Sequence, residues 1–347
     1  MKSQFYKNIE EVIYYDFEDA IYLITEDLDF KDLKEGSVGA IVPYIIAQES
    51  LQESGVLKIS FEKEEAAQTV IIPMDDVPQK PFEKGLTLLM FVDPLTPLFE
   101  PFIAALDDEL QDNMLYGSGV GSRSFASMPI IFSEGKISAE HALIVAFKSY
   151  VRVGLKHGWE PMHGPLVVTK TKGTELLEFN YDDAFEVYAD VIYKATGEEL
   201  TTDNFFDLAK GFPLGILSYA YDEFIIRDPL GRTEEGGLAL LNSIDEHETV
   251  YIMRGEPQEL IASAAKNAKE VAALSHESTY LLFDCISRVL YMEDEFNTEV
   301  KEIEMAAKDS TLNGICSTGE ITNVGFSKLI IFNKTNLLGA FYAADNY

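Results

Sequence analysis

Hydrophobic residues along this chain fall into short runs separated by polar, Gly-containing or Pro-containing segments, a pattern that predicts many strands. Runs rich in β-branched and aromatic residues predict strands because such side chains pack well on a pleated surface. The first run, Glu18–Thr25, is too short to distinguish a helix from a strand. Strands are predicted in the first half at Val38–Ile46, Gly55–Phe61, Thr69–Ile72, Leu86–Val92, Pro129–Phe132, His141–Phe147, Arg152–Leu155, Leu166–Thr171 and Glu175–Phe179.

Longer segments with apolar residues at three- and four-residue spacing predict amphipathic helices. Leu98–Gln111 is one, and another begins near Asp182, where the pattern changes and a second domain is expected. Pro257–Leu274 and Asp294–Lys308 are also predicted to be helical. Further strands are predicted at Gly215–Tyr219, Phe224–Ile226, Leu238–Leu241, Val250–Met253, Tyr280–Cys285, Leu329–Phe332 and Leu337–Tyr342.

Strands mixed with long helices, without regular βαβ alternation, predict an α+β fold. We expect two mixed-sheet domains, residues 1–181 and 182–347, with helices covering the sheet faces. The last strands carry few charges, so they are expected inside a sheet.

The charge balance narrows the classes of function. The 347 residues include 27 Lys and Arg against 59 Asp and Glu, a formal net charge of −32. Such a surface repels phosphate backbones and anionic lipid headgroups, so neither nucleic-acid binding nor membrane association is expected. The sequence shows no apolar run of membrane-spanning length and no signal peptide. Two cysteines, Cys285 and Cys316, in a chain without an export signal predict a reduced, cytoplasmic compartment.

Two segments invite a cofactor interpretation. Gly117–Gly121 (GSGVG) lacks the third glycine of a dinucleotide-binding fingerprint, so we expect a tight loop that needs positive φ instead. His157 and His163 lie in one predicted loop without the further ligands that a zinc site needs, which favours a solvated or hydrogen-bonded pair. His157 as an axial haem ligand stays open at this point.

Several polar residues stand at the ends of predicted strands, where pockets commonly form. Arg227 and Arg288 can bind a carboxylate through two parallel hydrogen bonds, but internal salt bridges explain them equally well. Cys285 is expected to be a buried inert thiol, with activation by Arg288 as the alternative. Glu320 lies in a predicted loop and can receive an amine or cap a helix.

Five segments stand in order along the chain: His157–Phe179, Phe224–Gly231 (FIIRDPLG), Phe283–Arg288 (FDCISR), Gly314–Ile321 (GICSTGEI) and Ile330–Leu338. In this order they resemble the FIST family of intracellular signal-transduction sensors, FIST N followed by FIST C. GSGVGS also resembles the family's Gly-rich segment, and the resemblance spans Lys31 to Leu338.

The resemblance implies a non-enzymatic sensory module that binds a small ligand, with amino acids among the proposed signals. Such modules act with histidine kinases, chemoreceptors or cyclic-dinucleotide enzymes. No such segment follows FIST C here, so we expect a stand-alone sensor that signals to a separate protein. The alternatives are a haem-binding nitric-oxide sensor partnered with a histidine kinase, or a ligand-free adaptor. An enzyme with Cys285 as nucleophile is a minor hypothesis.

Motif position and side-chain chemistry together suggest a ligand site, without a metal or cofactor. For an amino-acid ligand, Arg227 or Arg288 would hold the carboxylate, and Glu320 would meet the amine. Gly319 would allow a close backbone approach, and Cys285 would line the floor. The remaining polar contacts are expected from Asn333 and Thr335.

Overall fold

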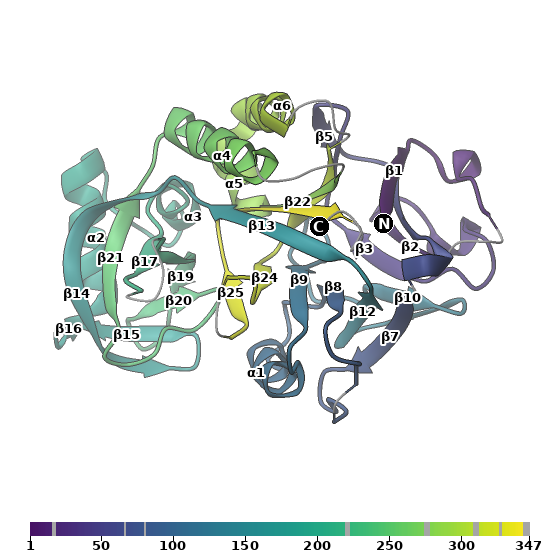
Figure 1. Cartoon of the computed structure of the whole chain (residues 1–347). Coiled ribbons are helices and arrows are strands. Elements are labelled where there is room, and N and C mark those ends of the chain that lie inside the picture. The colour runs from purple at the N-terminus through teal and green to yellow at the C-terminus, as the bar shows by residue number, and fades with distance from the viewer. Residues whose placement is uncertain are drawn as a thin grey trace.

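The computed structural model describes residues 1–15, 19–65, 67–79, 81–218, 223–273, 278–307, 312–325 and 328–342. Some predicted elements have one end outside these ranges, at Glu18, Tyr219, Leu274 and Lys308. The described residues form four β-sheets with helices packed outside them, which confirms the predicted α+β class (Figure 1). Among these residues, every helix is too short or too polar to cross a bilayer.

Two stacked mixed sheets form the middle of the molecule, and apolar side chains from both, including Phe91 and Phe283, fill the space between them. The first sheet has the spatial order β13 (Tyr150–Lys156), β26 (Asn336–Tyr342), β22 (Thr279–Cys285), β23 (Leu312–Ser317), β4 (Ile45–Ala47) and β5 (Ser50–Gln52). The second has the order β25 (Ile330–Phe332), β24 (Glu320–Thr322), β9 (Met114–Gly119), β8 (Thr87–Val92), β12 (His141–Phe147) and β7 (Gln68–Pro73).

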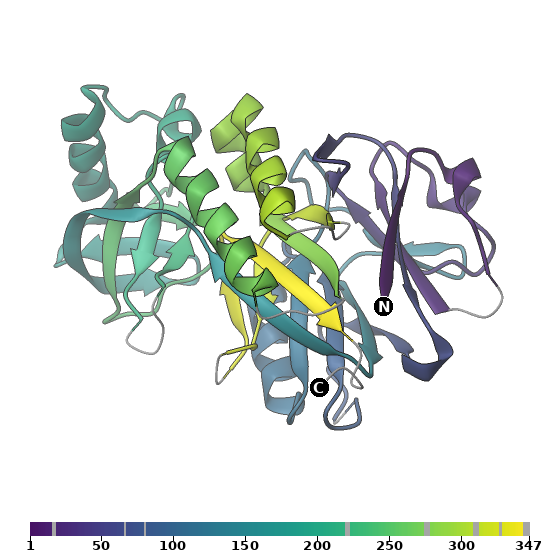
Figure 2. The same ribbon diagram turned by 45° about the horizontal axis from the view of Figure 1, so that its top comes forward.

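Helices cover the outer face of each central sheet. Above the first sheet lie α4 (Pro257–Ala272), α5 (Ile286–Met292) and α6 (Phe296–Ala307), and Figure 2 shows α4 and α6 side by side across it. Below the second sheet lies α1 (Phe99–Glu109), which buries Phe102 and Leu106 against it. The centre is therefore a helix–sheet–sheet–helix stack.

A third sheet closes one end of this stack and shares its apolar core. Its strands are, in spatial order, β1 (Lys2–Tyr6), β6 (Val56–Phe61), β2 (Asp19–Thr25), β3 (Gly39–Val42), β10 (Ile131–Ser133) and β11 (Lys136–Ser138). Short 3₁₀ turns occupy Ile9–Glu11, Phe30–Asp32, Lys63–Glu65 and Glu293–Glu295.

A strongly curved, barrel-like sheet forms the opposite end and has its own core. It is packed by α2 (Ala184–Thr196), which begins at the N-cap Asp183 and ends at Gly197 in the left-handed conformation, and by α3 (Phe205–Ala209). Its strands are β18 (Ile225–Arg227), β17 (Leu214–Ile216), β21 (Thr249–Arg254), β14 (Glu160–Lys172), β15 (Glu175–Phe179), β20 (Leu238–Leu240) and β19 (Pro229–Arg232), with β16 (Asp182–Asp183) paired to β15.

Both central sheets combine strands from the two halves of the chain. In the first sheet β23 pairs with β4, and in the second β24 pairs with β9. The two sequence halves therefore contribute to one shared core. The domain boundary expected between residues 181 and 182 does not separate the central sheets, and it stays a prediction. Of the two tail strands that were expected inside a sheet, β26 lies between β13 and β22, whereas β25 lies at the edge of the second sheet.

Three segments predicted as loops are strands instead. Gly117 and Gly119 lie in β9, His163 lies in β14, and Glu320 lies in β24. The prediction of positive φ in the Gly-rich segment is also wrong. Glycine is needed at position 119 for space, because a Cβ there would come within 2.9 Å of the Pro94 side chain. Close packing between residues that are distant in the sequence leaves no local sequence pattern.

We expect Tyr116→Phe to lower the free energy of unfolding by about 1–3 kcal/mol. The buried Tyr116 hydroxyl of β9 lies 2.6 Å from the carbonyl oxygen of Leu281 and 2.8 Å from that of Leu337, both in the other central sheet. Its loss removes a polar link between the stacked sheets. Urea denaturation measures the effect, and Tyr193→Phe, at an exposed position on α2, is the matched control. Equal stability of the two variants would contradict this role.

Candidate functional site

A cavity of about 770 Å³ lies between α1, the strands β17 and β18, the segment 243–248 and β25. Helix α1 belongs to the first half of the chain and β17, β18 and β25 belong to the second (Figure 1). The cavity is therefore built from both halves. A pocket between two parts of a fold is a common place for a small-molecule site.

Arg227, at the end of β18, is the cationic centre of this cavity. Its Nε–H donates to the carbonyl oxygen of Ser243 at 2.9 Å, and Nη1 donates to those of Ile226 and Ile331, each at 3.0 Å. No hydrogen bond from Nη2 is found among the described residues, and none of their carboxylates forms an ion pair with this guanidinium. The side chain is thus fixed on one edge and keeps donors for another group.

Burial lowers the pKa of Arg227 to about 10, and the nearby carboxylates of Glu100 and Asp245 oppose that shift. The guanidinium is still cationic at neutral pH. A charge with little water around it and no close counter-ion is costly, and an anionic ligand group that accepts from the two N–H groups of Nη2 offsets that cost. The geometry of Arg227 therefore favours a carboxylate or another small anion.

Glu100 of α1 organises the wall beside Arg227. One carboxylate oxygen accepts from the backbone N–H of Ser243 at 2.7 Å and from the Asn242 amide at 3.1 Å, and the other accepts from the Ser243 hydroxyl at 2.6 Å. These bonds connect α1 to Ser243, whose carbonyl oxygen also accepts a hydrogen bond from Arg227. Sequence reasoning missed all three residues, although Asn242 and Ser243 follow a predicted strand and could have been found by the reasoning applied to Arg227.

Apart from Ser218, Ser243 and Lys328, the rest of the cavity wall is aliphatic or acidic. Among the described lining residues there is no aromatic, cysteine or histidine side chain. The aliphatic part includes Ile103, Ile216, Ile225, Ile244, Leu329 and Ile331, and the acidic part is Glu100, Asp107, Asp108, Asp245 and Glu248.

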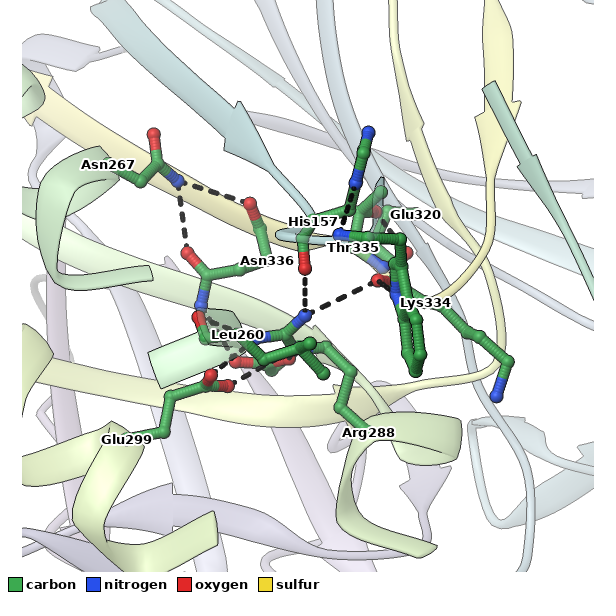
Figure 3. A network of polar contacts seen from close by, with 11 residues as sticks. His157, Leu260, Asn267, Arg288, Glu299, Glu320, Lys334, Thr335 and Asn336 are labelled. Carbon is green, nitrogen blue, oxygen red and sulfur yellow. Dashed lines mark hydrogen bonds and ion pairs between the residues drawn. The ribbon is translucent and has the colours of Figure 1, made fainter. Parts of the chain in front are cut away.

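Arg288, the other arginine predicted to hold a ligand, lies instead at the centre of a buried polar network (Figure 3). Its Nε lies 3.1 Å from both Asp284 and Glu299, and Nη2 also pairs with Glu299. The remaining N–H groups donate to main-chain carbonyl oxygens of His157, Leu260 and Lys334. Protein oxygens thus occupy every donor group, so Arg288 offers nothing to a ligand in this structure. Its geometry matches the salt-bridge alternative.

Glu320 and Thr335 lie next to this network and contact each other. Glu320 is fully buried in β24, and one of its oxygens accepts from the Thr335 hydroxyl and, at 3.3 Å, from the Thr335 backbone N–H. Burial raises the pKa of Glu320 to about 8, although the hydrogen bonds from Thr335 and Ser317 oppose the rise. A neutral carboxyl group at pH 7 is poorly suited to receiving a ligand ammonium.

The other predicted site residues are also buried outside the Arg227 cavity. Asn333 donates from its side-chain amide to Asn242 at 2.9 Å, which connects it indirectly to the cavity wall. Gly319 has φ +124°, and the close backbone approach of a ligand expected there stays a prediction. Burial raises the pKa of the Cys285 thiol, which fits an inert cysteine. Of the predicted set, only Arg227 lines the cavity.

His157 is buried, and its Nδ1 accepts from the backbone N–H of Trp159 at 2.9 Å, which places the proton of the neutral ring on Nε2. Nε2 lies 3.2 Å from a Glu223 oxygen but makes no hydrogen bond among the described residues. Burial, with Arg288 and Lys156 nearby, lowers the pKa of His157 to about 3 and keeps the ring neutral. In this structure Nε2 is buried beside Glu223. Among the described residues, no group of three His, Cys, Asp or Glu side chains is placed to hold a metal ion.

Comparison with known families assigns both halves of the chain to sensory domains of signal-transduction proteins. Residues 35–182 match the FIST N domain and residues 184–323 match the FIST C domain. The chain therefore belongs to the FIST family. No curated protein matches the sequence. Glu100 lies in the FIST N match and Arg227 in the FIST C match, so the cavity lies between the two domains.

Proposed function

We propose that this chain is a non-enzymatic sensor that binds a small carboxylate ligand, an amino acid or a related metabolite, in the Arg227 cavity. The observation that carries this proposal is a partly buried guanidinium at the wall of a cavity of about 770 Å³, which among the described residues makes no hydrogen bond through Nη2 and no ion pair. The carboxylate of the ligand accepts from the two N–H groups of Nη2. The aliphatic wall excludes water from this contact.

The ligand signal reaches a separate protein in this proposal. A histidine kinase, a chemoreceptor or a cyclic-dinucleotide enzyme in the cytoplasm receives it. A sensor needs two conformations with different ligand affinities. The position of the cavity supports this requirement, because α1 and β18 come from different domains and a bound ligand contacts both. Membership of the FIST family supports the sensory role.

A catalytic role has less support. Cys285, the nucleophile of the enzyme hypothesis, is buried, and its thiol pKa is raised. A thiol in that state reacts slowly, because the thiolate is the nucleophile. The described lining of the cavity offers no cysteine or histidine for covalent or acid–base chemistry.

Arg227→Met is expected to weaken ligand binding at least tenfold, because a charge-assisted hydrogen bond contributes about 1.5–3 kcal/mol. The measurement is a thermal-shift screen of the purified protein against the standard L-amino acids and short-chain carboxylates, followed by calorimetric titration of the best binder. Arg227→Lys keeps the charge without the planar fork and should bind with intermediate affinity.

The control is Arg232→Met, which removes an exposed arginine on β19 that pairs with Glu186 outside the cavity. It should bind as the wild type does. The unfolding midpoint without ligand is measured for every variant, because Arg227 also bonds to Ser243 and Ile331. If no carboxylate shifts the wild type, or if a folded Arg227→Met variant binds equally well, the proposal is wrong.

A further inference from the structure

The Arg227 cavity contains an unusual excess of carboxylates around its cationic centre. Five acidic side chains line it, against two cations, Arg227 and Lys328. Lys328, Asp108 and Asp245 are exposed, so water screens their charges more strongly than those of Arg227, Glu100, Asp107 and Glu248. Among the described residues, none of the five carboxylates forms an ion pair. The potential in most of the cavity is therefore negative, with one positive point at Arg227.

The five acidic side chains differ in how many hydrogen bonds they already accept from the protein. Both oxygens of Glu100 accept from Asn242 and Ser243, and one oxygen of Asp107 accepts from the backbone N–H of Leu329 at 2.7 Å. Among the described residues, the side chains of Asp108, Asp245 and Glu248 accept no hydrogen bond. Of these three, Asp245 and Glu248 lie on the segment that follows Ser243, whose carbonyl oxygen accepts from Arg227, so they are the groups that we assign to a cationic donor of a ligand held by Arg227.

The aliphatic part of the wall restricts the rest of the ligand. Strands β17, β18 and β25 and helix α1 all present Ile or Leu side chains to the cavity, and the described lining has no aromatic ring for stacking. An alkyl body gains free energy by burial against such a wall. A second carboxylate on the ligand loses hydration there and faces like charges.

We propose that the Arg227 cavity selects zwitterions with an aliphatic body and rejects dicarboxylates. Arg227 binds the carboxylate, Asp245 and Glu248 receive the ammonium group, and the isoleucine-rich wall packs on the alkyl group. This specificity rests on the proposed function of the cavity. It replaces Glu320, which is neutral and lies outside the cavity, as the partner of the ligand amine.

Calorimetric titration with four matched probes tests each recognition element separately. L-leucine carries all three groups, 4-methylpentanoate lacks the amine, 3-methylbutylamine lacks the carboxylate, and L-glutamate adds a second carboxylate. We expect L-leucine to bind at least tenfold more tightly than each of the other three. Equal binding of L-leucine and 4-methylpentanoate, or tighter binding of L-glutamate, would overturn the specificity.

The double variant Asp245→Asn with Glu248→Gln tests where the ammonium group binds. It should reduce the preference for L-leucine over 4-methylpentanoate to less than threefold and leave the affinity for 4-methylpentanoate unchanged or increased. The control pair, Glu10→Gln with Glu53→Gln, changes the net charge equally at exposed positions outside the cavity. An unchanged preference in the cavity variant would contradict the assigned roles.

The two levels of the proposal fail differently. If none of the four probes and no other carboxylate binds in an Arg227-dependent manner, the sensor site itself is wrong. If 4-methylpentanoate and L-glutamate bind as tightly as L-leucine, and Arg227→Met abolishes all three, the site is retained and only its selectivity for aliphatic zwitterions is wrong.

Discussion

Arg288→Met is expected to lower the free energy of unfolding by about 3–5 kcal/mol, because breaking a buried ion pair leaves an uncompensated charge. Arg288 is fully buried between the carboxylates of Asp284 and Glu299. Its guanidinium also donates to three main-chain carbonyl oxygens, from the turn before β14, from α4 and from the segment before β26. One substitution therefore removes the counter-ion of two buried acids and a link among three elements.

The loss of stability in Arg288→Met should become larger as the pH rises. Burial raises the pKa of Asp284 and the Arg288 guanidinium opposes that rise, so without the cation this pKa is higher still and the folded variant holds a proton that the unfolded chain releases. Its stability then falls as pH increases. Urea denaturation at pH 5 and pH 7 measures this, and the deficit relative to the wild type should be larger at pH 7.

Two further variants separate the ion pairs from general disruption. Arg254→Met removes an exposed arginine that pairs with Glu256, and we expect a loss below about 1 kcal/mol. Arg288→Lys keeps a positive charge but offers three donors instead of the planar fork, so it should stay clearly destabilised. A loss below about 1 kcal/mol for Arg288→Met would show that this network does not stabilise the fold.

The sequence predicted most elements because each has a local pattern. The helices at α1, α2, α4 and α6 show three- and four-residue spacing of apolar side chains, and buried strands such as β8 and β22 are continuous apolar runs. The arrangement of the strands did not follow from local patterns. Val38–Ile46, predicted as one strand, divides into β3 and β4 in two different sheets. Pairings between distant segments decide that division.

The candidate site could be predicted only in part for the same reason. Arg227 was found because it ends a strand and because arginine is scarce in this chain. Glu100 is one acid among 59 until the fold brings α1 against Ser243. Arg288 stands at an equivalent position in the sequence, yet Asp284 and Glu299 neutralise it in the fold. Whether a strand-end arginine is free or paired depends on residues far along the chain.

Glu320→Gln is expected to remove a pH dependence of stability. Burial raises the pKa of Glu320 to about 8 from an ordinary value near 4.5, so the folded protein holds a proton that the unfolded chain has released between those two pH values. The free energy of unfolding of the wild type therefore falls by about 1 kcal/mol per pH unit from pH 5 to pH 8 because of this group. Glutamine has nearly the same shape and does not ionise, so this contribution disappears.

The two proteins should be similarly stable at pH 5, and the variant should be more stable by roughly 3 kcal/mol at pH 8. Urea denaturation across this range measures both curves, and the contributions of the ionisable groups that both proteins share cancel in the difference. Glu53→Gln, at an exposed position, should give a curve parallel to the wild type. If the Glu320→Gln curve is also parallel to the wild type, Glu320 is ionised in the folded protein at neutral pH. An ionised Glu320 in β24 could attract the ammonium group of a ligand. The neutral state of Glu320 would then no longer support the assignment of the ammonium to Asp245 and Glu248, and only the position of Glu320 outside the cavity would.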